Sequence, residues 1–325
     1  MHMMSDAIKE FPKQFLYDPE IENAGAFRGG NTAVVVGMGG SHLAADLLKI
    51  RDPFISLIIH EDFGLPSLSD EKLQECLIIL NSYSGNTEET IDAYEKAHEF
   101  RLSTLVISSG GRLLERAKEN KTPFIRLPHL NIQPRMAIGL FLRALLHAVK
   151  RDDLMNETAA LAESLSALDQ EYEARKLFER IKKRVPIVYA SSRNRGVAYN
   201  WKIKFNETAK IPAFYNVVPE LDHNEMTGFD SAPETAKLSE NFYFLFLKDA
   251  NDDVRVQKRM TVLDRMYRQR GLRGEMLEID SSAGVFHGIF SSLLLADHAA
   301  LKLAEFYGVD PENVPIVEEF KKMVL

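Results

Sequence analysis

Two short polar turns, each set between an apolar run and a helical pattern, constrain the fold most. GMGGS at residues 37–41 follows the apolar run at 32–36, and NSYSGNT at 81–87 follows the run at 76–80. Runs that are apolar throughout are typical of parallel strands, which are buried on both faces of a sheet. Backbone N–H groups and hydroxyls at a helix N-terminus form a site for an anion. Two such turns in one sheet therefore predict a pocket for the phosphate of a small molecule.

The chain shows this strand–turn–helix order in two stretches. Apolar runs alternate with amphipathic patterns up to residue 127, a helical block at 135–183 follows, and the alternation resumes at 185. Such alternation predicts βαβ crossovers and parallel sheets. We therefore expect an α/β fold of two doubly wound, flavodoxin-like subdomains joined by helices, divided into residues 1–150 and 151–325. The expected strands are 32–36, 55–60, 76–80, 104–108, 123–127, 185–190, 214–218, 242–247 and 275–279. The expected helices lie near 41–50, 87–99, 112–119, 252–270, 287–307 and 313–323, and one more follows the turn at 191–196 and ends near 208.

Length and charge exclude several classes of protein. With 325 residues the chain is long enough for two domains of ordinary size. Its net charge of −7 gives no general electrostatic reason to bind nucleic acid or an anionic membrane. We find neither a signal-peptide core nor an apolar stretch near the ~20 residues of a membrane span. The single cysteine, Cys76, cannot form an internal disulfide, so we expect a reducing, cytoplasmic setting.

The first turn also resembles part of the dinucleotide fingerprint G-x-G-x-x-G. The sixth position is His42, whose side chain would obstruct the close approach of helix and strand that the last glycine permits. The acidic pair Glu61 and Asp62 nevertheless follows the next strand at a distance suited to a ribose hydroxyl. A nicotinamide site and a plain tight turn remain alternatives to a phosphosugar site.

The second turn has a simpler explanation in helix capping. Asn86 with Glu89 three residues later forms an acceptable capping box. Capping does not account for three hydroxyls around one glycine, so Ser82, Ser84 and Thr87 favour contact with a phosphate. The glutamates that follow would repel a dianion and should point to solvent.

Four charged residues in other segments are candidates for catalysis. Glu207 lies near the end of a helix, among flanking residues that suit a partly buried carboxylate. His223 lies between acidic residues in PELDHNE, Arg135 follows Pro134 and should open the helix at 135–150, and Lys302 lies on an amphipathic helix. Each has an ordinary alternative: a solvated surface charge, or a lysine that extends along apolar neighbours. No histidine belongs to a zinc-ligand pattern.

Several of these segments together resemble one family. NSYSGNTEET is similar to the SYSGNTEET signature of sugar isomerase (SIS) domains, and GMGGS, SGG at 109–111, Pro134–Arg135, KFNETAKIPAF and PELDHNE resemble the bifunctional phosphoglucose/phosphomannose isomerase family. The similarity runs from about residue 20 to the C-terminus. It implies an N-terminal SIS subdomain that binds phosphate and a C-terminal one that carries the catalytic glutamate, histidine and lysine. The phosphate and sugar contacts then fall on Gly39, Gly40, Ser41, Ser82, Ser84 and Thr87.

The resemblance also implies the catalytic roles. Glu207 matches the proton-transfer glutamate, Arg135 the arginine that stabilises the enediolate, and His223 with Lys302 the pair that opens the sugar ring. The family's histidine reaches into the active site of the partner subunit, so a homodimer is implied. Interconversion of an aldose and a ketose phosphate through a cis-enediol requires no metal and no redox cofactor. We therefore predict an isomerase of carbohydrate metabolism, in glycolysis or gluconeogenesis.

Four points stay open at the level of sequence. The resemblance implies a threonine two helical turns before the lysine in some members with dual activity, and Leu295 stands at that position here. Activity on glucose 6-phosphate is therefore predicted more strongly than activity on mannose 6-phosphate. A non-catalytic SIS regulator and an isomerase of another phosphosugar are the alternative functions. The turn after the strand at 185–190, SSRNRG, offers a second anion site but is better explained as structural, and His287 is left as a pocket residue without an assigned role.

Overall fold

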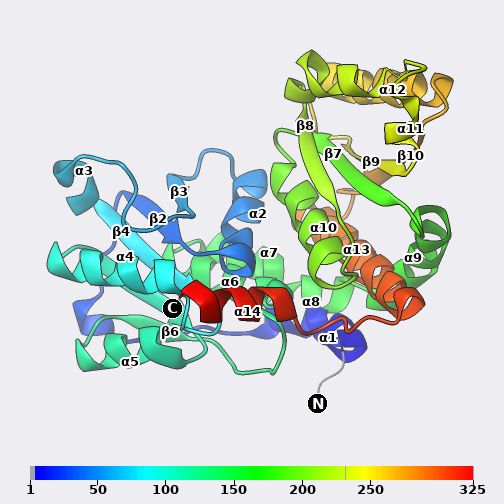
Figure 1. Ribbon diagram of the computed structural model, residues 1–325. Coiled ribbons are helices and arrows are strands. Elements are labelled where there is room, and N and C mark those ends of the chain that lie inside the picture. The colour runs from blue at the N-terminus through cyan, green and yellow to red at the C-terminus, as the bar shows by residue number, and fades with distance from the viewer. Residues whose placement is uncertain (1–3, 231, 325) are drawn as a thin grey trace. The chain divides into compact units, whose positions relative to one another are not determined.

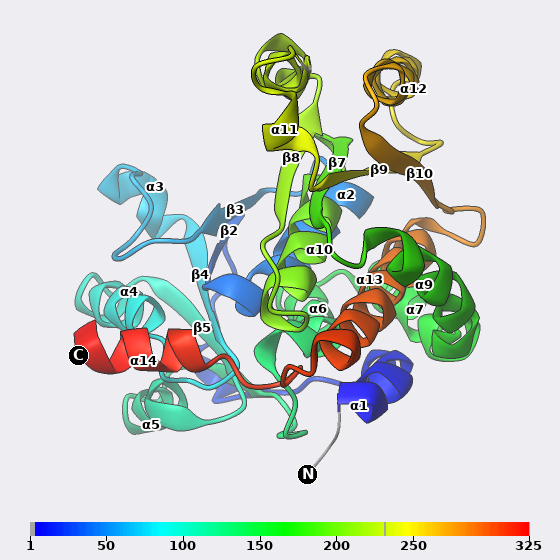
Figure 2. The same ribbon diagram turned by 45° about the vertical axis from the view of Figure 1, so that its right-hand side comes forward.

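The computed structural model describes residues 4–230 and 232–324. The chain separates into two compact units, and each has its own parallel sheet (Figures 1 and 2). Unit 1 comprises residues 10–164, and unit 2 comprises residues 4–9 and 165–324 of the described chain. The α/β fold with doubly wound parallel sheets is thus confirmed.

Unit 1 is built on a six-stranded sheet with the order β1-β6-β5-β4-β2-β3. All neighbouring strands are parallel except β1, which is antiparallel to β6. Without β1, the strands follow the order 2-1-3-4-5 of flavodoxin-like folds. The strands are β1 (Ile21–Glu22), β2 (Thr32–Val36), β3 (Leu57–His60), β4 (Cys76–Ser82), β5 (Ser103–Ser108) and β6 (Phe124–Arg126).

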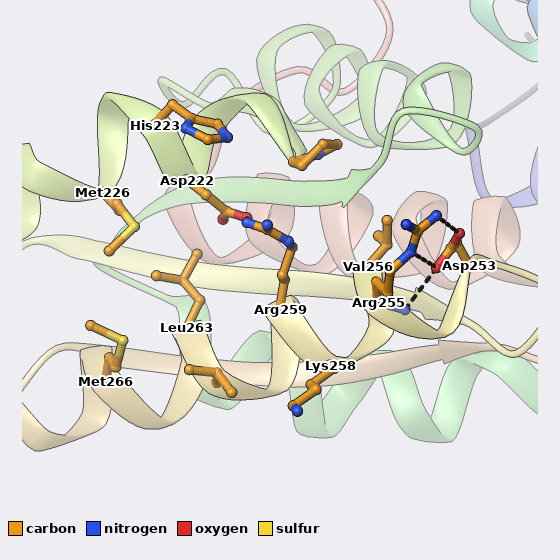
Figure 3. A pocket seen from close by; sticks show the side chains of 12 residues that line it. Asp222, His223, Met226, Asp253, Arg255, Val256, Lys258, Arg259, Leu263 and Met266 are labelled. Atoms are coloured by element: carbon orange, nitrogen blue, oxygen red, sulfur yellow. Dashed lines mark hydrogen bonds and ion pairs between the residues drawn. The ribbon is translucent and has the colours of Figure 1, made fainter.

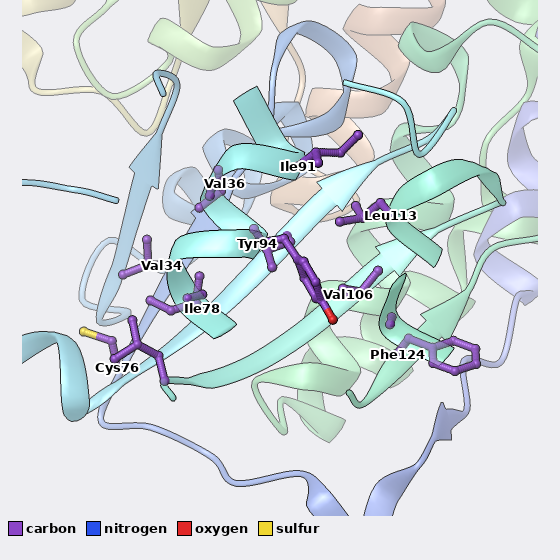
Figure 4. Packing of buried hydrophobic residues seen from close by; sticks show 14 of the residues in the cluster. Val34, Val36, Cys76, Ile78, Ile91, Tyr94, Val106, Leu113 and Phe124 are labelled. Atoms are coloured by element: carbon purple, nitrogen blue, oxygen red, sulfur yellow. The ribbon is translucent and has the colours of Figure 1, made fainter. Parts of the chain in front are cut away.

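Helices cover the sheet of unit 1 because its strands are apolar on both faces. On one face, Ile91 and Tyr94 of α4 and Leu113 of α5 pack on Ile78 and Val106 of the central strands (Figure 4). The helices of unit 1 are α2 (Leu43–Arg51), α3 (Asp70–Gln74), α4 (Glu88–Glu99), α5 (Gly111–Glu119), α6 (Ile138–Ala148), α7 (Asp152–Ala159) and α8 (Leu161–Ser164), with the 3-10 turns η1 (Phe11–Leu16), η2 (Ala24–Ala26), η3 (Gly39–Ser41) and η4 (Pro134–Met136).

Unit 2 has a four-stranded, fully parallel sheet with the order β10-β9-β7-β8. One face is covered by an aromatic cluster in which Tyr267 of α12 packs on Phe244 and Tyr189. The elements are α1 (Met4–Glu10), α9 (Ala167–Ile181), β7 (Val185–Ser191), α10 (Arg195–Glu207), β8 (Phe214–Val218), η5 (Glu220–His223), η6 (Glu225–Phe229), α11 (Ala236–Ser239), β9 (Phe242–Asp249), α12 (Val254–Gln269), β10 (Arg273–Ile279), α13 (Val285–Tyr307) and α14 (Pro315–Val324).

The helical block expected at 135–183 is more divided than its sequence suggests. The α-helix after Pro134 begins at Ile138 rather than at Arg135, which lies in the 3-10 turn η4. Further breaks follow α6, where Lys150 has a φ of 57°, and precede α9, where Ser166 accepts a hydrogen bond from the N–H of Asp169. The block from 136 to 183 contains one glycine and no proline, so only the acidic pair at 152–153, where α7 begins, indicates a break in its sequence.

Candidate active site

The two polar turns come together at the switch point of unit 1. They follow β2 and β4, which are parallel neighbours, while the chain continues to β3 on one side and β5 on the other. In open α/β sheets, ligands bind outside the carboxyl ends of the strands at the point where the strand order reverses. The position of the turns is therefore that of a ligand site.

Close backbone packing shapes the first turn. Gly39 has a φ of 52°, in the region that favours glycine. A Cβ on Gly40 would lie 2.7 Å from the backbone N of Arg135, so only glycine lets η3 approach η4. The side chain of Arg135 is buried, and Oγ of Ser41 accepts a hydrogen bond from the N–H of Tyr83 at 3.4 Å. The structure thus brings Arg135 to the first turn and joins the first turn to the second.

Hydroxyl groups organise the second turn. Oγ of Ser82 lies 2.9 Å from Oγ1 of Thr87 and accepts a hydrogen bond from the N–H of Gly85 at 3.0 Å. Ser84 is exposed, and its Oγ accepts a hydrogen bond from the N–H of Asn86. Gly85 has a φ of 69°, and a Cβ there would lie 1.7 Å from the carbonyl oxygen of Gly110. The SYSGNT and SGG segments therefore pack directly on each other.

The capping alternative for the second turn does not form. Thr87 is the N-cap residue of α4, and its side chain makes no capping hydrogen bond. Oδ1 of Asn86 instead accepts a hydrogen bond from the N–H of Arg112 at 3.1 Å, which joins the turn to α5. Glu88 is exposed, as expected for a carboxylate next to an anion site, and Glu89 is partly buried.

The residues considered for a dinucleotide site make contacts within the protein. His42 is fully buried, with Nδ1 at 2.7 Å from Oδ2 of Asp46 and Nε2 at 3.3 Å from Oε2 of Glu61. The carboxylate of Asp62 accepts the N–H of Phe63. Glu61 therefore faces His42 rather than a position for a ribose hydroxyl, which weakens the nicotinamide alternative.

In unit 2, two buried polar contacts hold α10 against α13. The indole Nε1–H of Trp201 donates to Oγ of Ser292 at 3.0 Å. Nζ of Lys204 donates to Oδ1 of Asp297 at 2.6 Å, and both side chains are almost completely buried, at 3% and 4% exposure. Lys204 follows Trp201 on α10, and its partner Asp297 follows Ser292 on α13. The two helices therefore run in the same direction.

Two predicted catalytic residues lie on the same side of the Lys204–Asp297 contact. Glu207 is partly buried and is the last residue of α10, three positions after Lys204. Lys302 is five positions after Asp297 on α13. Glu207 and Lys302 therefore both follow the Lys204–Asp297 contact in the chain direction of their helices.

Lys302 has an acidic neighbour on α9 that the sequence did not indicate. Its Nζ donates to Oε1 of Glu171 at 3.4 Å, and this interaction lowers the pKa of the Glu171 carboxyl. His298 is buried one helical turn before Lys302, and burial lowers the pKa of its imidazole. Since Glu171 lies 131 positions from Lys302 in the sequence, no spacing pattern could reveal the pair.

His223 lies at the end of η5 and is exposed. It lines a pocket of about 760 Å³ between the η5–η6 segment and α12, with Met226, Leu263 and Met266 as apolar neighbours (Figure 3). Asp222, the acidic residue before His223, accepts a hydrogen bond from Nη1 of Arg259 at 3.0 Å. The other flanking acid, Glu225, accepts from the hydroxyl of Tyr189 at 2.6 Å.

Side chains fill the corresponding switch point of unit 2. Oγ of Ser191 donates to Oδ1 of Asp252 at 2.7 Å, and Nη1 of Arg193 donates to Oδ2 of Asp249 at 2.8 Å. Nδ2 of Asn194 donates to both carboxylates. Two carboxylates occupy the place where an anion would bind, which agrees with a structural role for this turn.

The predicted residues thus fall into one set in each unit. Unit 1 carries what we call the phosphate set, which comprises the predicted phosphate and sugar contacts Gly39, Gly40, Ser41, Ser82, Ser84 and Thr87 together with the catalytic candidate Arg135. Unit 2 carries what we call the proton-transfer set, which comprises the catalytic candidates Glu207, His223 and Lys302. His287 is partly buried in the first turn of α13. Among the described residues, no group of three His, Cys, Asp or Glu side chains is placed to hold a metal ion. No helix of the described chain is long and apolar enough to cross a membrane.

Comparison with known proteins identifies the family. Residues 170–324 match the family described as bacterial phospho-glucose isomerase C-terminal SIS domain. The chain is 31% identical to the bifunctional phosphoglucose/phosphomannose isomerase of Aquifex aeolicus over 328 residues, which covers 99% of this chain and 98% of that protein. This chain belongs to the bifunctional phosphoglucose/phosphomannose isomerase family.

Other similarities agree with the family. The protein of the same name from Thermoplasma volcanium is 32% identical over 295 residues, with 90% of each chain covered. Among solved structures, the tagatose-6-phosphate ketose/aldose isomerase of Escherichia coli matches with a TM-score of 0.66 at 16% identity, covering 95% of this chain and 94% of that chain. At that identity, the structural match supports the fold alone.

Proposed function

We propose that this member of the phosphoglucose/phosphomannose isomerase family interconverts glucose 6-phosphate and fructose 6-phosphate through a cis-enediol. One observation carries the proposal. Ser41, Ser82 and Thr87 gather at the switch point of unit 1, in a chain that aligns with isomerases over nearly its whole length. A switch point lined with hydroxyls and backbone N–H groups suits a phosphate dianion.

The phosphate set supplies binding and charge. A chain with a net charge of −7 needs a local cation to hold a sugar phosphate, and Arg135 is a buried cation beside the first turn. Arginine at developing negative charge lowers the energy of an enediolate. Phosphate binding away from the reacting carbons holds them in place for proton transfer.

The proton-transfer set supplies the chemistry. Lys302 and His223 act at the ring oxygen and the anomeric hydroxyl to open the sugar ring. Glu207 then removes the proton from C2 of the open aldose and returns it to C1, while the proton of the C2 hydroxyl passes to O1, which gives the ketose. A carboxylate and two nitrogen acids or bases suffice for these steps, because no electrons leave the substrate. The mechanism requires that C1 and C2 of a sugar bound by unit 1 reach Glu207.

We further propose that the protein acts as a homodimer in the cytoplasm. His223 is exposed at the end of η5, and its two acidic neighbours are engaged with Arg259 and Tyr189. An exposed histidine without a role in its own unit suits a residue that completes the site of a second copy. The closed symmetry of a dimer would give each of two sites one such histidine.

The substrate assay separates this function from its alternatives. Purified protein is given glucose 6-phosphate, mannose 6-phosphate and an aminosugar phosphate in turn, and fructose 6-phosphate is measured by a coupled reaction. We expect turnover of glucose 6-phosphate, and a lower rate with mannose 6-phosphate because Leu295 replaces a threonine. Turnover of only the aminosugar phosphate would support the neighbouring phosphosugar function, and binding without turnover would support an SIS regulator.

Replacing the base tests the mechanism. Glu207→Gln keeps the size of the side chain and removes the carboxylate, so we expect the turnover number to fall at least ~100-fold. Binding of fructose 6-phosphate, measured by calorimetry, should be retained because the phosphate set is unchanged. Turnover near the wild-type rate would exclude Glu207 as the base.

A further inference from the structure

The most deeply buried ion pair described in unit 2 has no part in the proposed chemistry. Lys204 and Asp297 have side-chain exposures of 3% and 4%, and Nζ and Oδ1 lie 2.6 Å apart. Removing two charges from water costs several kcal/mol per ion, and replacement of such a pair by apolar residues is often neutral or stabilising. Stability alone therefore does not explain why this pair stands between α10 and α13.

Its position in the helix pair suggests another purpose. Lys204 lies one turn before Glu207 on α10, and Asp297 lies on α13 between Ser292 and Lys302. An apolar contact tolerates sliding of one helix along the other, whereas a buried charged hydrogen bond has a narrow range of length and direction. The pair therefore fixes the position of α10 along α13 one helical turn before Glu207.

We propose that Lys204 and Asp297 are positioning residues that set where Glu207 lies, along the axis of the helix pair, relative to Lys302. The inference rests on the proposed function, in which Glu207 moves the proton and Lys302 opens the ring. Neither Lys204 nor Asp297 touches the substrate; they act through the two helices. A displacement of about 1 Å between the catalytic ends costs as much as ~100-fold in rate.

A neutral, apolar pair separates positioning from stability. In Lys204→Met with Asp297→Val, the helices keep a packed contact but lose the directional bond. We expect kcat to fall at least ~10-fold, with the KM for fructose 6-phosphate within about twofold of the wild type. The thermal unfolding midpoint should not fall. The single tryptophan, Trp201, packs in the same interface, so an unshifted emission spectrum verifies that α10 and α13 remain together.

Ser292→Ala is the matched control. It removes the other polar contact between the same helices, the one from Trp201, which lies farther from the catalytic ends. We expect this variant to lose some stability and to retain kcat. Should the Met/Val double variant be poorly folded, Lys204→Leu with Asp297→Ala also lacks the directional bond and is measured in the same way. A folded variant of either kind with wild-type kcat overturns the proposal.

A spectroscopic measurement keeps this test independent of activity. Reductive ¹³C-methylation labels the lysines, and the Lys302 signal is assigned by its loss in Lys302→Arg. We expect the signal of Lys302 to shift in the Met/Val double variant and not in Ser292→Ala. An unchanged signal contradicts the proposal. A wild-type protein with no isomerase activity would overturn the proposed function, while the Lys302 signal would still decide whether the pair positions the two helices.

Discussion

At the scale of single residues, the second turn has a hydroxyl network that a phosphate would join. Thr87 is partly buried, and its Oγ1 lies 2.9 Å from Oγ of Ser82 at the carboxyl end of β4. Thr87→Val preserves the shape and removes one hydrogen bond to the anion. We predict that the inhibition constant for inorganic phosphate and the KM for fructose 6-phosphate both rise about tenfold, because a hydrogen bond to a charged group contributes ~1.5–3 kcal/mol.

Thr32→Val is the control for this prediction. Thr32 is also partly buried, and its Oγ1 lies 2.7 Å from Oγ of Ser56, but it stands at the opposite end of β2. Inhibition by phosphate should be unchanged in this variant. Equal effects of the two substitutions would show that the loss at Thr87 is structural.

At the scale of elements, strands were easier to predict from the sequence than helix boundaries. The apolar runs at 32–36, 76–80 and 242–247 mark buried parallel strands within two residues of their observed ends. The turns after the first two runs could be found because each combines glycine with hydroxyl side chains. The break before α9 could not, since no proline or glycine marks it, and Pro134 marks a helix start without showing that its first turn, at Arg135, is a 3-10 turn.

Contacts between elements could not be predicted from the sequence, for a different reason. Asp222 and Glu225 flank His223 in the sequence, yet both contact partners on other elements. The pairs Lys204–Asp297 and Glu171–Lys302 join residues 93 and 131 positions apart. Only the packing of α9, α10 and α13 brings these side chains together.

The filled switch point of unit 2 gives a pH-dependent prediction. Burial raises the pKa of Asp252, the hydrogen bond from Ser191 opposes this rise, and the charge of Asp249 adds to it. With a pKa above that of the unfolded chain, Asp252 lowers stability as pH rises through the interval between the two values, and the penalty persists above it. Asp252→Asn removes this charge. We predict a higher unfolding midpoint by calorimetry, with a larger gain at pH 8 than at pH 4.

Asp253→Asn, at the neighbouring position, provides a control in which the expected change in stability has the opposite sign. Interaction with Arg255 lowers the pKa of Asp253 to about 2, and its carboxylate caps α12. That group stabilises the fold above its unfolded pKa, so its replacement should lower the midpoint at pH 8. A lower midpoint for Asp252→Asn at pH 8 would contradict the assignment of Asp252 as a buried, unfavourable charge.

At the scale of the whole molecule, the proposed dimer gives each active site residues from two copies. Glu207→Gln and His223→Ala should each be nearly inactive alone. When the two variants are unfolded together and refolded as a mixture, half of the dimers are mixed, and one of the two sites in each has both residues intact. We predict recovery of about a quarter of the wild-type activity. If the refolded mixture is dimeric but recovers no activity, His223 and Glu207 of one chain must belong to the same site.

Solvent deuterium provides the most direct measurement of the central claim, which is that Glu207 moves a proton between C1 and C2 of a bound sugar phosphate. Fructose 6-phosphate is incubated with the protein in D₂O, and ¹H NMR follows the loss of signal at C1 and the labelling of C2 in the aldose product. We predict that the wild type introduces deuterium at both carbons and that Glu207→Gln, which still binds the sugar phosphate, introduces it at neither. Exchange at the wild-type rate in Glu207→Gln would contradict the account.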